Sequence, residues 1–159
     1  MCKTALRGTK EGGRQALKII KMTTGHVKAL AELDKACFAV PWSENSFRNE
    51  AENALAKYFV AEENGEIVGY GGVWIVGEEG QITNIAVLPK YRRCGIASML
   101  LEKIIEECTG LCRIVLEVRE SNKGAISLYE KFGFKNVGTR KNFYHSPTEN
   151  AIIMIRGDA

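Results

Sequence analysis

The sequence predicts an α+β domain in which about four helices flank a mixed, mostly antiparallel sheet of about seven strands. Three observations support this fold class. Short apolar runs alternate with amphipathic segments of helical period. Turn signals at Asn64-Gly65 and at residues 77–80 (GEEG) join three of these runs consecutively, as in an antiparallel meander. The order strand, helix, helix, three strands, helix, strand, helix, two strands is typical of a layered domain.

The first half of the chain begins with an expected strand at residues 16–23 (ALKIIKMT). A helical pattern then opens at residues 24–25. Pro41 interrupts this helix because it cannot continue the backbone hydrogen bonding. Ser43 is expected to cap a second, short helix, with Phe47 on its inner side.

In the second half, the helical period returns at Gly95 and ends at Gly110, a residue type that favours helix C-termini. Residues 112–120 (CRIVLEVRE) form an expected strand. Ser121 or Asn122 is expected to cap the helix that follows it. The last two strands are expected at residues 132–144 and 151–157.

Composition and charge indicate an ordinary single domain: the chain has 159 residues, of which 45% are hydrophobic and 26% charged. The net charge of +3 is too small to indicate nucleic-acid binding by itself. No apolar run approaches the roughly 18 residues of a membrane helix. We therefore predict a cytoplasmic protein that binds neither nucleic acid nor membrane, with a flexible basic arm at residues 1–15 and one domain at 16–159.

The five cysteines follow neither a disulfide framework nor a zinc-binding spacing, and only two histidines accompany them. Reduced thiols in the cytoplasm are the simplest expectation. The sequence therefore predicts no metal site.

Residues 91–97 (YRRCGIA) form a basic turn at the start of the third expected helix. A helix N-terminus presents unpaired N–H groups and a positive dipole end, so it binds phosphate readily. Gly95 and Ala97 leave room for a ligand, and Arg92 and Arg93 can add charge-assisted contacts. The Lys-Ser/Thr pair of a nucleotide P-loop is missing, which disfavours ATP and GTP. A solvated basic turn explains the loop alone equally well.

Four segments carry a family resemblance: PWSENSF (41–47), TNIAVLPKYRRCGIASMLLEKII (83–105), LEVRESNKGAISLYEKFGFKNVGTRKNFY (116–144) and AIIMIR (151–156). In this order they resemble the GCN5-related N-acetyltransferase (GNAT) family, and within it the RimI-like branch of bacterial ribosomal-protein acetyltransferases. In this family a loop of the form Gln/Arg-x-x-Gly-x-Gly/Ala holds the pyrophosphate of acetyl-coenzyme A. The matching loop here runs from Arg92 to Ala97. The resemblance implies the GNAT fold for residues 16–157.

The resemblance also implies acetyl-coenzyme A as cosubstrate, without a metal. In the family, the strand before the phosphate loop separates from its neighbour, and its free backbone groups bind the pantetheine arm. The N–H of Val87 would then polarise the thioester carbonyl. The implied donor-binding residues are Ile85, Ala86, Val87, Arg92, Arg93, Cys94, Gly95, Ile96, Ala97, Ser98 and Asn122.

Glu117 is the candidate general base. It lies between Leu116 and Val118, and burial among such neighbours would make its carboxylate a stronger base. Strict alternation instead places it on one face with Arg113 and Arg119, where it would be solvated or paired with Arg119. The matching glutamate of the resembled branch is a proton acceptor, which implies that role here, directly or through a water molecule.

Tyr129 is the candidate general acid. Periodicity alone makes it an aromatic residue of the core stripe of its helix. In the resembled family, however, the tyrosine of the frame SNxxAxxLYExxGF, here residues 121–134, meets the coenzyme A sulfur. The resemblance therefore implies that the Tyr129 hydroxyl protonates the leaving thiolate.

Trp42 and Tyr144 are the candidate acceptor-binding residues, because their segments resemble those that frame the peptide-entry groove of RimI-like enzymes. A core position explains Trp42 equally well. The usual Tyr-Tyr pair of the branch is Phe143-Tyr144 here, and Asn150 replaces a common acidic residue. The resemblance therefore leaves the peptide preference open.

Together these expectations predict direct transfer of an acetyl group to a protein N-terminal α-amine, that of a small-subunit ribosomal protein beginning with alanine. Two alternatives keep the same fold. One is an acetyltransferase acting on a small amine or a lysine side chain, and the other is a non-catalytic acetyl-coenzyme A-binding module.

Overall fold

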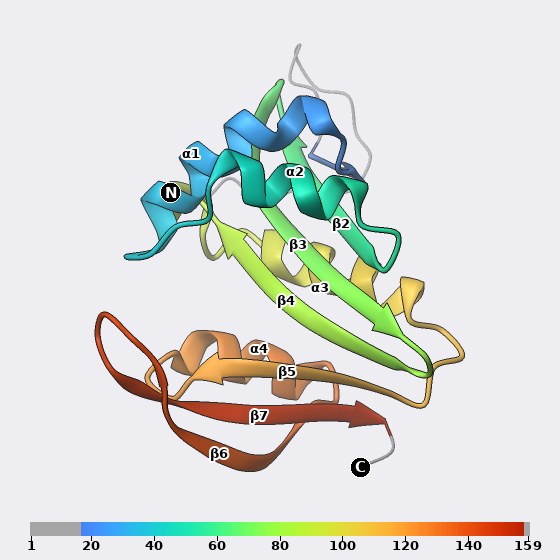
Figure 1. The fold of residues 1–159 in the computed structure, drawn as a ribbon, viewed down its shortest axis with the longest axis vertical. Coiled ribbons are helices and arrows are strands. Elements are labelled where there is room, and N and C mark those ends of the chain that lie inside the picture. The colour runs from blue at the N-terminus through green and yellow to red at the C-terminus, as the bar shows by residue number, and fades with distance from the viewer. Residues whose placement is uncertain (1–16, 158–159) are drawn as a thin grey trace.

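The computed structural model of the protein describes residues 17–157, so the predicted basic arm lies outside the described residues. Helices and strands follow each other in the predicted order (Figure 1). The elements are β1 Lys18–Lys21, η1 Thr24–His26, α1 Val27–Cys37, α2 Glu44–Glu52, β2 Ala56–Glu63, β3 Glu66–Val76, β4 Glu79–Val87, η2 Pro89–Tyr91, α3 Ile96–Glu107, β5 Arg113–Arg119, α4 Lys123–Lys131, β6 Lys135–Tyr144 and β7 Glu149–Gly157.

The predicted local signals explain where several elements begin and end. The Ser43 hydroxyl accepts a hydrogen bond from the Ser46 N–H at the start of α2 (3.1 Å), which confirms Ser43 as the cap. Asn64 and Gly65, with φ values of 50° and 79°, make the two-residue turn between β2 and β3. The next turn is tighter than predicted, because β3 ends at Val76 and β4 already begins at Glu79.

All seven strands form one mixed sheet in the order β1-β2-β3-β4-β5-β7-β6. Every neighbouring pair is antiparallel except β4 and β5, which are parallel. These two strands are paired only from Glu79–Arg113 to Gln81–Val115. Beyond this point they diverge and open the middle of the sheet (Figure 1). The strand before the basic loop is thus separated from its neighbour, as the family resemblance implied.

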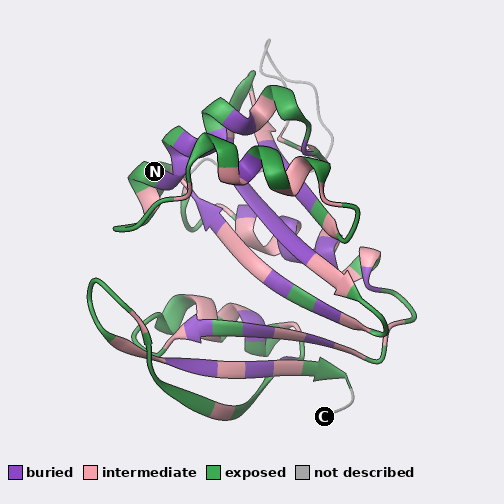
Figure 2. Ribbon diagram, viewed as in Figure 1, coloured by how far each residue is buried: buried purple, intermediate pink, exposed green. Residues whose placement is uncertain are grey.

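Helices cover both faces of the sheet, with α1 and α2 in front and α3 and α4 behind in the view of Figure 1. The front helices bury residues such as Leu30 and Phe47, each fully shielded from solvent. Burying a side chain of this size stabilises the fold by about 1.5–3 kcal/mol. The rear core contains Leu100, Leu101 and Ile104 of α3, together with Tyr129 of α4. Figure 2 shows buried residues concentrated in the sheet and on the helix faces that meet it.

A β-bulge interrupts β4 shortly before the strand reaches the basic loop. Gly72 of β3 pairs with Asn84, and Val73 pairs with Ile82, so Thr83 is the extra residue of β4. The Thr83 hydroxyl bonds to the Tyr58 hydroxyl at 2.6 Å and donates to the Gly72 carbonyl at 3.3 Å. Bulges redirect side chains and occur often beside active sites. This one sets the direction in which Asn84 points.

None of the helices within residues 17–157 combines the length and hydrophobicity that a membrane span requires.

Candidate active site

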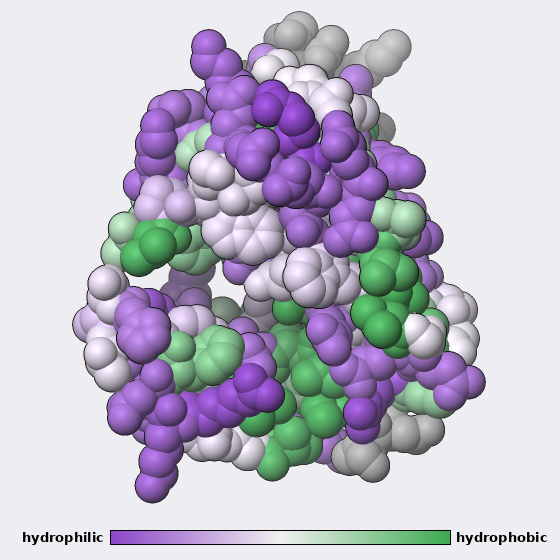
Figure 3. All heavy atoms as spheres, viewed as in Figure 1, coloured by the Kyte–Doolittle hydropathy of each residue, from purple (hydrophilic) through white to green (hydrophobic). Residues whose placement is uncertain are grey.

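A cleft of about 1370 Å³ lies where β4 and β5 diverge. Its walls come from these two strands, the starts of α3 and α4, the α1–α2 loop and the β6–β7 loop. Figure 3 shows the front face of the molecule hollowed between its α1–α2 half and its β5–β7 half. The cleft is lined by almost all of the predicted site residues: Trp42, Ile85, Ala86, Val87, Arg92, Arg93, Gly95, Ile96, Ala97, Ser98, Glu117, Asn122, Tyr129 and Tyr144. Cys94, also predicted, is not among the lining residues.

The basic loop brings the N-terminus of α3 to one end of the cleft. Gly95 is the N-cap of α3 with φ 79°, and Arg93 is also left-handed with φ 64°. Apart from its chain neighbours, a Cβ on Gly95 would meet no atom of residues 17–157 within 4 Å, so the positive φ, rather than crowding, favours glycine there. No acidic residue lies in the first turn of α3. Its unpaired N–H groups therefore present a positive end that suits an anion.

The end of β4 connects this loop with the α1 helix. The Val87 carbonyl accepts a hydrogen bond from Arg92 Nε at 3.1 Å and one from the Cys37 thiol at 3.5 Å. On its other side, β4 pairs with β3 from Val87–Gly69 back to Glu79–Val76. Residues 85–87 have no β5 partner, so their backbone groups on that side face the cleft.

Glu117 lies in the cleft, but the expectation that burial would strengthen it as a base is wrong. The residue is exposed, because alternation along β5 turns Leu116 and Val118 into the rear core and Glu117 to the other side. The expected partner is also wrong: Glu117 Oε1 forms an ion pair with Arg140 of β6 at 3.1 Å, whereas Arg119 pairs with Glu149. Such a partner on another strand could not be found from the spacing within β5.

Tyr129 is placed compatibly with both interpretations that the sequence left open. Its ring is buried in the rear core, 5.7 Å from the Phe134 ring. Its hydroxyl has no hydrogen-bond partner within residues 17–157, yet no fully buried side-chain oxygen in that range lacks a partner. The hydroxyl oxygen must therefore reach the open cleft. Burial raises the pKa of Tyr129 well above its ordinary value, so the hydroxyl keeps its proton at neutral pH.

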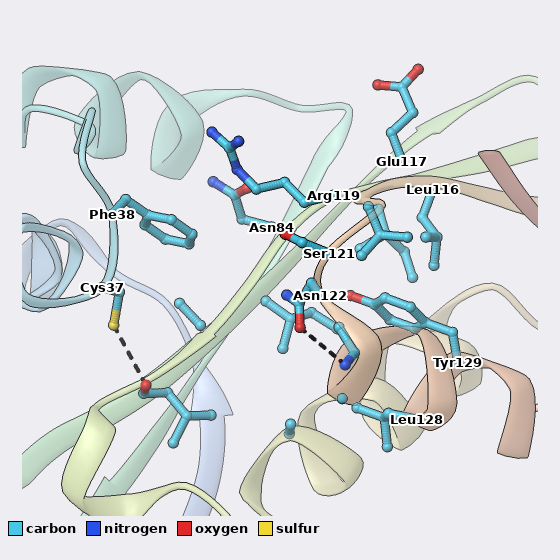
Figure 4. A pocket seen from close by; sticks show the side chains of 18 of the residues that line it. Cys37, Phe38, Asn84, Leu116, Glu117, Arg119, Ser121, Asn122, Leu128 and Tyr129 are labelled. Carbon is cyan, nitrogen blue, oxygen red and sulfur yellow. Dashed lines mark hydrogen bonds between the residues drawn. The ribbon is translucent and has the colours of Figure 1, made fainter. Parts of the chain in front are cut away.

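Asn122 caps α4 beside Tyr129, with its Oδ1 accepting from the Ala125 N–H at 3.2 Å. Figure 4 shows Asn122 and Tyr129 on one side of the strands, and Glu117, Arg119 and Asn84 extending on the other. The cleft thus has two sides. Tyr129 belongs to the side of α3 and α4, and Glu117 belongs to the side of α1 and α2.

Arg119 organises the β6–β7 loop and was not predicted to do so. Its guanidinium donates to the carbonyls of His145 (3.1 Å) and Pro147 (3.0 Å) and lies 4.5 Å from the centre of the Tyr144 ring. It also pairs with Glu149 at 3.6 Å. Hydrogen bonds from Ser121 hold the pKa of Glu149 below its ordinary value, so this ion pair persists into mildly acidic solution.

The two aromatic candidates line the cleft from different elements, Trp42 from the α1–α2 loop and Tyr144 from the end of β6. Tyr144 is half-buried, and burial together with nearby Glu117 raises the pKa of its hydroxyl to about 12. Trp42 is half-buried too, and its ring centre lies 5.5 Å from that of Phe47. Trp42 therefore packs on the front core while it lines the cleft, so the two interpretations of this residue are compatible.

Sequence reasoning also missed Asp34, whose side chain is buried beneath the front helices with only 1% exposed. It accepts hydrogen bonds from the Trp42 N–H (2.8 Å) and the Tyr70 hydroxyl (2.7 Å). One signal was available. Asp34 follows Leu33 and lies four positions after Leu30, which places an acidic residue within the apolar stripe of α1.

Residues 27–134 match the acetyltransferase (GNAT) family. The chain belongs to this family. A protein of Bacillus subtilis (strain 168) is 43% identical to this GNAT chain over 126 residues, which cover 77% of this chain and 83% of the relative. The ribosomal protein bS18-alanine N-acetyltransferase of Haemophilus influenzae is 39% identical, over 79% of this chain and 88% of the relative.

The solved structures agree with these sequence relatives. The crystal structure of the ribosomal-protein-S18-alanine N-acetyltransferase from Escherichia coli has a TM-score of 0.82 and 34% identity to this GNAT chain. The similarity covers 90% of this chain and 96% of that one. This confirms the predicted GNAT fold and the predicted similarity to the RimI-like ribosomal-protein acetyltransferases.

Proposed function

We propose that this enzyme transfers the acetyl group of acetyl-coenzyme A directly to the α-amine of an N-terminal alanine in a small-subunit ribosomal protein. The observation that carries the proposal is the divergence of β4 from β5. It brings the N-terminus of α3, the Tyr129 hydroxyl and the Glu117 carboxylate into one cleft.

The donor is expected on the side of α3 and α4. The N–H groups at the start of α3 would hold the pyrophosphate, with Arg92 and Arg93 adding positive charge. The free backbone of residues 85–87 would bind the pantetheine arm, as an added strand binds to a sheet edge. The Val87 N–H would polarise the thioester carbonyl. These groups require an elongated donor with an anionic end, which fits acetyl-coenzyme A.

The acceptor amine is expected from the side of α1 and α2, where Glu117 lies. An α-amine has a pKa of about 7.7–8.0, so a modest base is sufficient at neutral pH. Glu117 would accept the proton of the amine, directly or through a water molecule, as the amine nitrogen bonds to the acetyl carbon. As the carbon–sulfur bond breaks, Tyr129 would donate its proton to the sulfur. The products are an N-acetylated protein and free coenzyme A.

The choice of acceptor rests on the relatives of this chain. Those of Haemophilus influenzae and Escherichia coli, 39% and 37% identical, are both ribosomal protein bS18-alanine N-acetyltransferases. The cleft supports this choice, since aromatic side chains that suit packing against an extended chain terminus, Trp42 and Tyr144, both line it.

The deciding experiment measures acetyl transfer to short peptides that differ in their first two residues, using purified enzyme and acetyl-coenzyme A. We expect a peptide with the alanine N-terminus of bS18 to be the best acceptor. An N-terminally blocked lysine peptide and a polyamine serve as controls. Transfer to either control but not to free N-termini would assign the enzyme to small amines or lysine side chains. Acetyl-coenzyme A binding without transfer to any acceptor would indicate a binding module.

A further inference from the structure

A chain of three buried or half-buried polar side chains leads from the front core to the cleft. It begins at Asp34, which within residues 17–157 is the one acidic or basic side chain that is buried. Both of its carboxylate oxygens are engaged, Oδ1 by the Tyr70 hydroxyl and Oδ2 by the Trp42 N–H. A buried carboxylate is costly unless it is hydrogen-bonded in this way. Because its burial is costly, Asp34 is expected to have a specific role.

The carboxylate determines the direction of the next hydrogen bond. Burial raises the pKa of Asp34, and the hydrogen bonds from the Trp42 N–H and the Tyr70 hydroxyl oppose that rise by stabilising the carboxylate. As a carboxylate Asp34 can only accept, so the Tyr70 hydroxyl gives its single proton to Asp34. Tyr70 is fully buried, and burial with the neighbouring Asp34 charge raises its pKa far above the ordinary value, so it stays protonated. Its oxygen can then only accept from the third member, Asn84, whose Nδ2 lies 3.3 Å away.

This arrangement fixes both ends of the Asn84 amide. With Nδ2 held by Tyr70, the carbonyl Oδ1 is the end that is left for a ligand. Asn84 lines the cleft, and the bulge at Thr83 turns its side chain toward the front face. Figure 4 shows Asn84 on the same side of the strands as Arg119 and Glu117. This is the side from which the acceptor is expected to enter.

We propose that Asn84 Oδ1 accepts a hydrogen bond from an N–H group at the amino end of the acceptor, and that Asp34 and Tyr70 are positioning residues that hold this amide in its accepting orientation. The proposal rests on the proposed function, because it assigns a further residue to the same cleft. Two N–H groups have the required chemistry: the attacking α-amine and the first peptide N–H. The experiment below distinguishes them.

The direct test measures acetyl transfer by the Asn84→Ala variant to a peptide that begins with alanine. We expect kcat/KM for the peptide to fall about tenfold, since one hydrogen bond to the acceptor is lost, while KM for acetyl-coenzyme A stays unchanged. Gln81→Ala is the matched control, because Gln81 lies on the same strand, donates to Glu79 and does not line the cleft. An unchanged kcat/KM in Asn84→Ala would overturn the proposal.

Methylated peptides identify which N–H group of the acceptor donates the hydrogen bond to Asn84. One peptide carries a methyl group on the α-amine and the other on the first peptide nitrogen. One of the two methylations removes the N–H that bonds to Asn84. This methylation should lower the kcat/KM of the wild-type enzyme by a larger factor than it lowers the kcat/KM of the Asn84→Ala variant. If both methylations have equal effects on the two enzymes, Asn84 does not contact either group and the proposal is wrong.

Asp34→Asn tests the positioning role without changing the size of the side chain. The new amide can donate to Tyr70, which frees the Tyr70 proton for Asn84 and turns the Asn84 NH₂ group toward the cleft. We expect a loss of kcat/KM similar to that of Asn84→Ala, and no further loss when both substitutions are combined. Additive losses would show that Asp34 acts separately, by supporting the fold.

The outcomes separate this inference from the proposed function. If the wild-type enzyme acetylates no peptide N-terminus, the proposed function fails. If it does so and Asn84→Ala is equally active, the function stands and only the inference fails. A poorly folded Asp34→Asn protein would leave the Asn84→Ala and methylation tests decisive.

Discussion

The two sides of the cleft are built in different ways. The donor side consists mainly of backbone: the start of α3, the left-handed residues Arg93 and Gly95, and the β4 residues that lack a β5 partner. The acceptor side consists of side chains from distant parts of the chain. Glu117 is paired with Arg140, and Arg119 holds the β6–β7 loop.

This difference has a physical consequence. A site made of backbone tolerates many side chains, so its sequence signature is short and its geometry follows from the fold. A site made of paired side chains depends on each partner, and a single substitution can change which acceptor fits. We therefore expect substitutions on the donor side to change the chemistry or coenzyme binding, and substitutions on the acceptor side to change the use of peptide.

Tyr129→Phe should have the largest effect. Loss of the hydroxyl removes the proton donor for the thiolate, and we expect kcat to fall by about 10²–10³-fold. Coenzyme binding should change little, because the ring still fills the rear core. Stopped-flow transfer rates and calorimetric binding would measure the two quantities. Tyr58→Phe, which removes a buried hydroxyl bonded to Thr83 at a residue that does not line the cleft, is the control. If Tyr129→Phe has the turnover of the wild-type enzyme, the role of Tyr129 is purely structural.

Glu117→Gln should lower kcat/KM for the peptide by about 10²-fold, because the amine loses its proton acceptor. Glu102→Gln, a change at an exposed residue of α3, controls for the lost charge. An unchanged kcat/KM in Glu117→Gln would exclude Glu117 as the base.

Gly95→Ala should weaken coenzyme binding by up to about tenfold. An alanine at φ 79° carries a strain of about 1–2 kcal/mol, which favours a rearranged loop at the start of α3. Gly25→Ala is the control, because Gly25 lies outside the cleft and does not have a positive φ. The prediction is contradicted if KM for acetyl-coenzyme A does not change.

Arg119→Gln should have the smallest effect, a rise of about fivefold in KM for the peptide with kcat nearly constant. The change removes the cation that holds the loop carbonyls and stacks on Tyr144. Arg113→Gln is the matched control, since Arg113 lies on the same strand and pairs with Glu79 outside the cleft. Equal peptide KM values for these two variants would show that the loop does not contact the acceptor.

The features that the sequence could predict are those that depend on residues close together in the chain. The element order, the hairpin at Asn64-Gly65 and the caps Ser43 and Asn122 depend on local signals, and the structure confirms them. The helix start at Gly95 is equally local. Period-2 alternation also placed Glu117 on the exposed face, although its neighbours suggested burial.

Contacts between distant segments could not be predicted in this way. Arg140 lies 23 positions after Glu117, and Asn84 lies 50 positions after Asp34, so no spacing rule connects them. Their proximity follows from the strand order β5-β7-β6 and from the packing of α1 on the sheet. The bulge at Thr83 also has no clear signal in the sequence, since it depends on the register of β3 and β4.

The Val87 carbonyl suggests an order of substrate binding. It is shared by Arg92 of the basic loop and by Cys37 at the end of α1, just before the loop that leads to Trp42. A donor that fixes Arg92 would therefore also steady the segment that the acceptor meets. We expect acetyl-coenzyme A to bind first and the peptide second. Product inhibition that is competitive between coenzyme A and acetyl-coenzyme A, but not between coenzyme A and the peptide, would reveal this order.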